Sequence, residues 1–122
     1  MSHFTYIKTR FQNLLYLEKS LNRLNISYKY KLSNGSNVGL IIPQSNKHDA
    51  EFVWNGREYQ LKADIQLWKQ EYSIENFIDK ISQQYAGEVI ISESQKLGFQ
   101  PIQYKQNSDG SNILVLERWN NQ

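Results

Sequence analysis

The chain contains no cysteine, and this absence excludes several classes of function at once. A protein without thiols has no disulfide, no thiolate nucleophile and no thiolate ligand for a metal ion. Histidine is almost as scarce: His3 and His48 are the only two, and no metal-binding spacing surrounds either of them. Nucleophile elbows, phosphate-binding loops and dinucleotide-binding fingerprints are missing too. We therefore expect no metal site, no catalytic residue and no cofactor.

Long apolar runs and runs of like charge are also missing. No segment approaches the ~20 apolar residues that a membrane span needs, and the first residues alternate instead of forming a signal or transit peptide. The 14 basic and 12 acidic residues are interspersed and leave a net charge of +2. Such a mixture predicts no dominant phosphate-binding surface. We expect no membrane span, no nucleic-acid partner, and a protein used in the compartment where it is made.

The residues that are present indicate one domain over 1–122 with an aromatic-rich core. Of the 122 residues, 39% are apolar and 13% are aromatic. A chain of this length buries roughly two-thirds of its unfolded surface, which is enough for an independent core. Asn, Ile, Lys and Tyr are abundant whereas Ala and Arg are scarce. This bias is typical of an AT-rich genome, such as that of an organelle or endosymbiont.

The dipeptide Asn55-Gly56 is the strongest local signal, because Asn-Gly favours the two-residue type I′ turn of a β-hairpin. In that register Trp54 faces Arg57 and Phe52 faces Tyr59. Alternate residues of the hairpin then share one side of the sheet. The predicted core side consists of Ala50, Phe52, Trp54, Arg57, Tyr59, Leu61, Ala63 and Ile65.

Further strands are predicted from alternation of apolar and polar residues. We expect three of them over residues 3–10, 27–32 and 38–42, the last closed by a proline. A second hairpin is predicted from residues 102–106 and 112–119, which flank a turn-forming segment.

Two helices are predicted from the 3.6-residue periodicity. The first follows an N-cap at Asn13, and the second begins at Ser73. The first carries a leucine stripe at Leu14, Leu17, Leu21 and Leu24. Residues 87–97 allow two interpretations: Gly87 ends the second helix before a short strand, or the helix continues and stops at Gly98. We prefer the longer helix, because its apolar face continues and the segment ends in a typical C-terminal cap.

The combination of elements predicts the fold class. Two amphipathic helices among antiparallel strands indicate an α+β fold, specifically a two-layer sandwich that is broadly ferredoxin-like with extra strands. Packing under the helices then explains Tyr28 and Tyr30, which share one face of a strand.

Three segments resemble a known family. They are Met1-Ser2-His3-Phe4 through Ile7-Lys8-Thr9, then Trp54-Asn55-Gly56 with Tyr59, Leu61, Ala63-Asp64 and Trp68, and finally Gly98-Phe99 with Asp109-Gly110-Ser111, Leu114-Val115 and Arg118-Trp119. In this order they resemble the Ycf thirty-five family, a hypothetical chloroplast reading frame with cyanobacterial relatives. The resemblance spans essentially the whole chain and implies a plastid-encoded protein of the chloroplast stroma. It implies no activity, and it carries over no catalytic residue.

Trp68 and Lys69 are the candidate partner-binding residues. They lie between the central hairpin and the second helix, a connection where a large ring can be half exposed beside a basic residue. Tryptophan is enriched at protein interfaces, because one rigid ring buries a large area. The alternative is that Trp68 covers the end of the core and has a structural role only.

Three functions are compatible with the sequence. The first is a non-catalytic interaction or assembly factor of the plastid stroma, on which another plastid protein docks near Trp68 or at a free sheet edge. The second is a small enzyme or ligand-binding domain with a pocket between sheet and helices, and the third is an RNA-binding sheet. An exposed apolar patch would favour the interaction factor. A pocket converging on His3, Lys8 or Arg10 would favour the enzyme or ligand-binding domain. A basic sheet face would favour the third.

Overall fold

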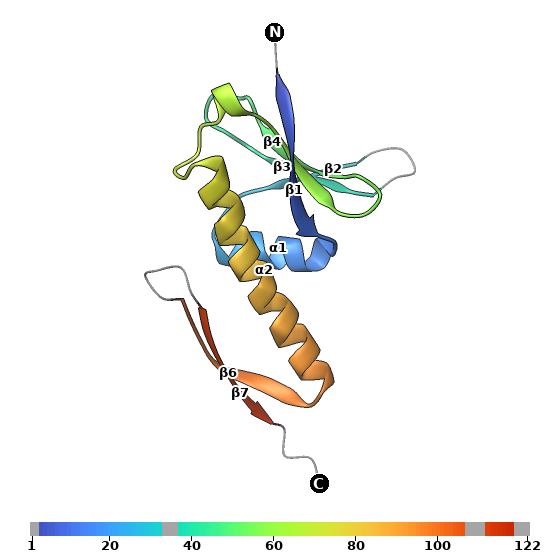
Figure 1. Ribbon diagram of the computed structural model, residues 1–122, viewed down its shortest axis with the longest axis vertical. Coiled ribbons are helices and arrows are strands. Elements are labelled where there is room, and N and C mark those ends of the chain that lie inside the picture. Colours follow the sequence, from blue (N-terminus) through green and yellow to red (C-terminus); the bar gives the residue numbers. More distant parts are fainter. Residues whose placement is uncertain (1–2, 33–36, 107–111, 119–122) are drawn as a thin grey trace.

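The computed structural model describes residues 3–32, 37–106 and 112–118 (Figure 1). Its centre is a five-stranded sheet in the order β1-β5-β4-β3-β2, in which every neighbouring pair is antiparallel. The strands are β1 (Phe4–Phe11), β2 (Lys29–Lys31), β3 (Gly39–Ile42), β4 (Ala50–Trp54) and β5 (Tyr59–Asp64). The predicted strands are therefore confirmed, and among the described residues β1 forms one free edge of the sheet.

Two helices cover one face of this sheet, and local capping sets where they begin. Helix α1 (Leu14–Arg23) starts where the Asn13 side chain accepts a hydrogen bond from the Tyr16 N–H at 3.2 Å. Helix α2 (Ile74–Lys96) starts in the same way, with the Ser73 hydroxyl accepting from the Asn76 N–H at 3.2 Å. Both N-caps agree with the prediction.

The longer interpretation of the second helix is confirmed. Residues 87–96 are helical, and the chain leaves α2 through Gly98 at φ +88°. This left-handed conformation favours glycine, which explains why the helix stops there and not at Gly87. Gly87 is buried inside the helix.

A single core joins the sheet to both helices. Its largest fully buried side chains are Phe11, Leu17, Leu21, Leu40, Ile42, Phe52, Leu61 and Ile81. The leucine stripe of α1 therefore packs inward as predicted, with Leu17 and Leu21 inaccessible and Leu14 and Leu24 packed at the margin. Phe52 lies at the centre, because β4 has a strand on both sides.

The register of the central hairpin differs from the predicted one. Trp54 pairs with Tyr59 and Phe52 with Leu61, so the connection has four residues instead of two. The Asn55 side chain closes this loop by accepting hydrogen bonds from the N–H groups of Arg57 and Glu58, both at 2.9 Å. Asparagine stabilises its own turn in this way, and that removes the need for a type I′ turn.

Two residues predicted on the core side of the hairpin are exposed. Arg57 lies in the hairpin loop, outside the strands. Ile65 is 56% exposed in the short 3-10 helix η1 (Ile65–Leu67), where the Asp64 carboxylate accepts from the Gln66 N–H and ends the strand. The other predicted core positions keep their side of the sheet, because the register moved by two residues and the alternation has a period of two.

The second hairpin forms a sheet of its own. Strands β6 (Phe99–Gln106) and β7 (Asn112–Arg118) pair with each other and contact α2, which runs from the large sheet to this hairpin (Figure 1). The turn around residues 108–110 and Trp119 lie outside the described residues. The α+β class is confirmed, and its strand order is a run of antiparallel neighbours instead of the split βαβ order of a ferredoxin-like sheet.

Candidate functional site

Trp68 follows η1 and covers one end of the core. Its ring packs edge to face on Phe77 of α2, with ring centres 5.0 Å apart at an angle of 74°. Its indole N–H donates a hydrogen bond to the Tyr72 carbonyl at 2.7 Å. The ring is nevertheless only partly buried. Trp68 is therefore a structural lid that keeps one side open to solvent.

An apolar groove lies on that open side, and we call it the Trp68 groove. Its volume is about 530 Å³, and its apolar wall consists of Ile7, Ile65, Trp68, Ile74 and Ile78. Glu75 and Asp79, from the first turns of α2, stand at its rim. The groove thus combines side chains from β1, η1 and α2 in an apolar floor with an acidic border.

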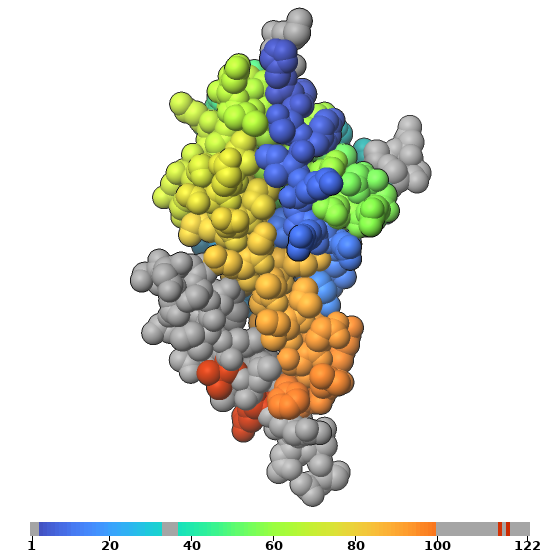
Figure 2. Space-filling model, in the orientation of Figure 1, coloured from blue at the N-terminus to red at the C-terminus, as the bar shows by residue number. Residues whose placement is uncertain are grey.

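The groove runs beside the free edge of the sheet. Ile7 belongs to β1, which has only β5 as a strand neighbour within the described part of the chain. Figure 2 shows β1 in blue at the surface, next to the first turns of α2 in yellow. The two docking places predicted separately, the surface near Trp68 and a sheet edge, are therefore one continuous surface.

Lys69, the second candidate, is not part of this groove. Its backbone N–H donates to the Gln44 side chain at 2.5 Å, while its own side chain is exposed. Sequence reasoning joined Lys69 to Trp68 because they are adjacent in the chain. It did not predict that Ile65 lies at the surface. The residue that could have indicated this is Asp64, whose side chain caps the 3-10 helix and so ends the strand before Ile65.

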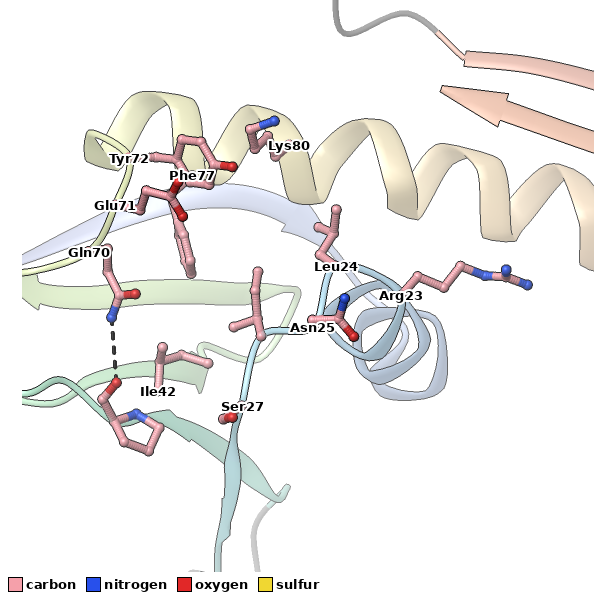
Figure 3. Close-up of a pocket in the computed structure, with 12 residues that line it drawn as sticks. Arg23, Leu24, Asn25, Ser27, Ile42, Gln70, Glu71, Tyr72, Phe77 and Lys80 are labelled. Carbon is pink, nitrogen blue, oxygen red and sulfur yellow. Dashed lines mark hydrogen bonds between the residues drawn. The ribbon is translucent and has the colours of Figure 1, made fainter. Parts of the chain in front are cut away.

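A second cavity of about 510 Å³ lies between the end of α1, β3 and the start of α2 (Figure 3). Its charged lining residues are Arg23, Glu71 and Lys80. The Arg23 guanidinium pairs with the buried Glu88 and points away from the other lining residues in Figure 3. The Lys80 ammonium lies 4.7 Å from the Tyr72 ring centre. This arrangement brings no acid and base together around a reacting atom.

The predicted pocket residues lie elsewhere. His3, Lys8 and Arg10 line neither this cavity nor the Trp68 groove. His3 donates its backbone N–H to Asp64 at 3.3 Å, and His48 is exposed in the loop before β4. Within residues 3–32, 37–106 and 112–118, no three His, Cys, Asp or Glu side chains group as metal ligands.

The two tyrosines of the β2 region converge on α1. Both hydroxyls donate to the Glu18 carboxylate, that of Tyr28 at 3.1 Å. The hydrogen bond to Glu18 raises the pKa of Tyr30 to about 12, and burial raises the pKa of Tyr28 and of Tyr59. Tyr28 packs on the core as predicted, but Tyr30 is exposed, because β2 is the short edge strand. Because their pKa values are raised, these hydroxyls stay protonated at a pH where an ordinary tyrosine begins to ionise.

Neither helix in the described part of the chain has the length and apolar character to cross a bilayer.

Known proteins similar to this chain were found along almost its full length. The family described as "Protein of unknown function (DUF1257)" matches residues 14–115. The protein called "Uncharacterized protein ycf35" of Trieres chinensis is 57% identical, over 95% of this chain and 97% of its own. The protein with the same name in Pyropia yezoensis is 41% identical, over 98% of this chain and 99% of its own. The one in Guillardia theta is 40% identical, over 98% of this chain and 98% of its own. No solved structure matches the chain.

The matched lengths cover both helices, the central hairpin and the segments that form the Trp68 groove. Names of the ycf type denote plastid reading frames, which agrees with the AT-rich composition. The chain belongs to the ycf35 family, described as DUF1257.

Proposed function

We propose that this protein is a non-catalytic interaction or assembly factor that binds an extended segment of another plastid protein. The observation that carries the proposal is the Trp68 groove beside the free edge of β1. Ile65 is 56% exposed there, and an apolar side chain at this level of exposure gains by being covered.

The mode of binding that fits this surface is addition of a strand. An edge strand offers unpaired backbone N–H and C=O groups, and β1 has eight residues over which a partner strand could pair. Alternate side chains of such a strand would point toward the groove, where Ile74 and Ile78 could contact them. The rim carboxylates Glu75 and Asp79 favour a segment that also carries lysine or arginine.

A matched pair of variants tests the site. We expect Ile65→Glu to weaken partner capture at least about 30-fold, because a carboxylate would then replace the exposed apolar contact. Ile90→Glu is the control, since Ile90 is 49% exposed on a part of α2 outside the groove. The measurement is affinity isolation from plastid lysate with quantitative mass spectrometry, followed by titration of the captured protein. Equal capture by the two variants would contradict the proposed site.

The compartment that we propose is the stroma. The plastid names of the relatives support the organelle, and the interspersed surface charge is compatible with its aqueous phase. We expect the protein in the supernatant after plastid lysis, as measured by immunoblotting of fractions. Recovery of most of it in carbonate-washed thylakoids would contradict this placement.

A further inference from the structure

The face of the large sheet opposite the helices forms a second surface, which we call the outer face. The core row of the sheet is Ile7, Leu61, Phe52 and Leu40, so the residues next to these in each strand point the other way. One row of the outer face crosses all five strands and consists of Tyr6, Lys62, Glu51, Ile41 and Lys29. Within the described residues no helix covers it.

Lysines gather on this face although they are scattered in the sequence. Lys8, Lys29, Lys31 and Lys62 come from three strands and share the outer face through the strand register. The acidic side chains there are already engaged. Glu51 pairs with Lys31 at 3.1 Å, and the Asp64 carboxylate accepts from backbone N–H groups of His3 and Gln66. Lys31 is itself engaged in that pair, but the outer-face strand positions still carry four lysines against these two carboxylates, so the face offers positive charge to an outside partner.

Two aromatic rings stand beside these lysines. Phe4 and Tyr6 are 49% and 53% exposed, although both are aromatic residues of a β-strand. They are two residues apart on β1, so their side chains leave the same face about 7 Å apart. The Lys62 ammonium lies 4.6 Å from the Phe4 ring centre. Lys62 is also the cross-strand partner of Tyr6, so the same cation stands beside both rings, which suits a ligand that combines flat groups with negative charges.

We propose that the outer face binds single-stranded nucleic acid. Bases stack on Phe4 and Tyr6, and the lysines pair with phosphates; stacking of this kind accepts any base. A duplex hides the faces of its bases, so it leaves the two rings unused. Composition predicted no such partner, because the net charge is only +2 and the lysines are interspersed. The proposal goes beyond the Trp68 groove, which lies on a different surface.

The test is fluorescence anisotropy with labelled oligo(U) and oligo(dT) of about 12 nucleotides, a length within the range of one small binding domain. We expect saturable binding of at least one oligonucleotide, and weaker binding of a duplex of the same length. Tyr6→Ala should weaken the single-strand complex at least about fivefold. Tyr16→Phe is the aromatic control, since Tyr16 belongs to α1.

A charge variant tests the phosphate contacts separately. Lys8→Gln combined with Lys29→Gln should reduce the slope of log K against log salt by about 1.4, while Lys19→Gln with Lys96→Gln should leave it unchanged. All four lysines are exposed, so the unfolding midpoint checks that each variant is folded. Failure of the wild-type protein to bind either oligonucleotide would overturn the proposal. So would equal binding by Tyr6→Ala and its control.

Discussion

Replacement of Phe52 by alanine should lower the free energy of unfolding by about 4 kcal/mol. Phe52 is 0% exposed, it lies between Leu40 and Leu61 on the neighbouring strands, and its ring centre is 6.2 Å from that of Phe11. Truncation removes a large buried ring and leaves a cavity that neighbouring strands cannot fill, a change that typically costs about 3 to 5 kcal/mol. Chemical denaturation monitored by circular dichroism measures the loss.

Trp54→Ala provides the comparison for this prediction. Trp54 is on the same side of the same strand, but it lies at the strand end and is only partly buried, packed on Tyr59 with ring centres 5.0 Å apart. We expect a loss about half as large as that for Phe52. A loss below about 1 kcal/mol for Phe52→Ala would show that this side of the sheet faces solvent and that the core is misassigned.

Trp68→Ala is the second change for which we expect a large effect, about 3 kcal/mol. The ring packs on Phe77, and the indole N–H binds the Tyr72 carbonyl, so truncation uncovers one end of the core and releases the loop before α2. Because this substitution destabilises the fold so strongly, Trp68→Ala is a poor test of partner binding. The exposed Ile65 is the better residue for that purpose.

Trp68→Phe separates the two contributions of this residue. A phenyl ring keeps the contact with Phe77 but has no donor for the Tyr72 carbonyl, so we expect a loss of about 1 kcal/mol. The same denaturation experiment measures both variants. If Trp68→Ala costs less than about 1 kcal/mol and still abolishes partner capture, Trp68 is an interface residue and not a lid.

Features that depend on residues close together in the chain were predictable from the sequence. The N-caps Asn13 and Ser73 bond to N–H groups three residues away, and Gly98 ends α2 through its own backbone conformation. The leucine stripe of α1 follows from a periodicity within one helix. Local geometry alone determines each of these features, so the folded protein shows them as predicted.

The register of the central hairpin was not predictable in the same way. Asn55-Gly56 is compatible with a loop of two or four residues, and both place the same residues on the core side apart from Arg57, which the longer loop takes out of the strand. The choice depends on how Phe52 and Trp54 pair with Leu61 and Tyr59 while β1 and β3 pack on either side. Contacts between distant residues outweigh the turn preference here, because they involve far more buried area.

By itself, the sequence determined the α+β class and where both helices begin, since local periodicity and capping decide them, and its motifs indicated the family. Only the tertiary structure decided the two candidate surfaces. The Trp68 groove joins Ile7 to Ile65 and Ile78, and the outer face joins Lys8 to Lys29 and Lys62. Strand order and register bring these residues together. Both are set by the packing of the whole core, so they cannot be inferred from any single segment of the chain.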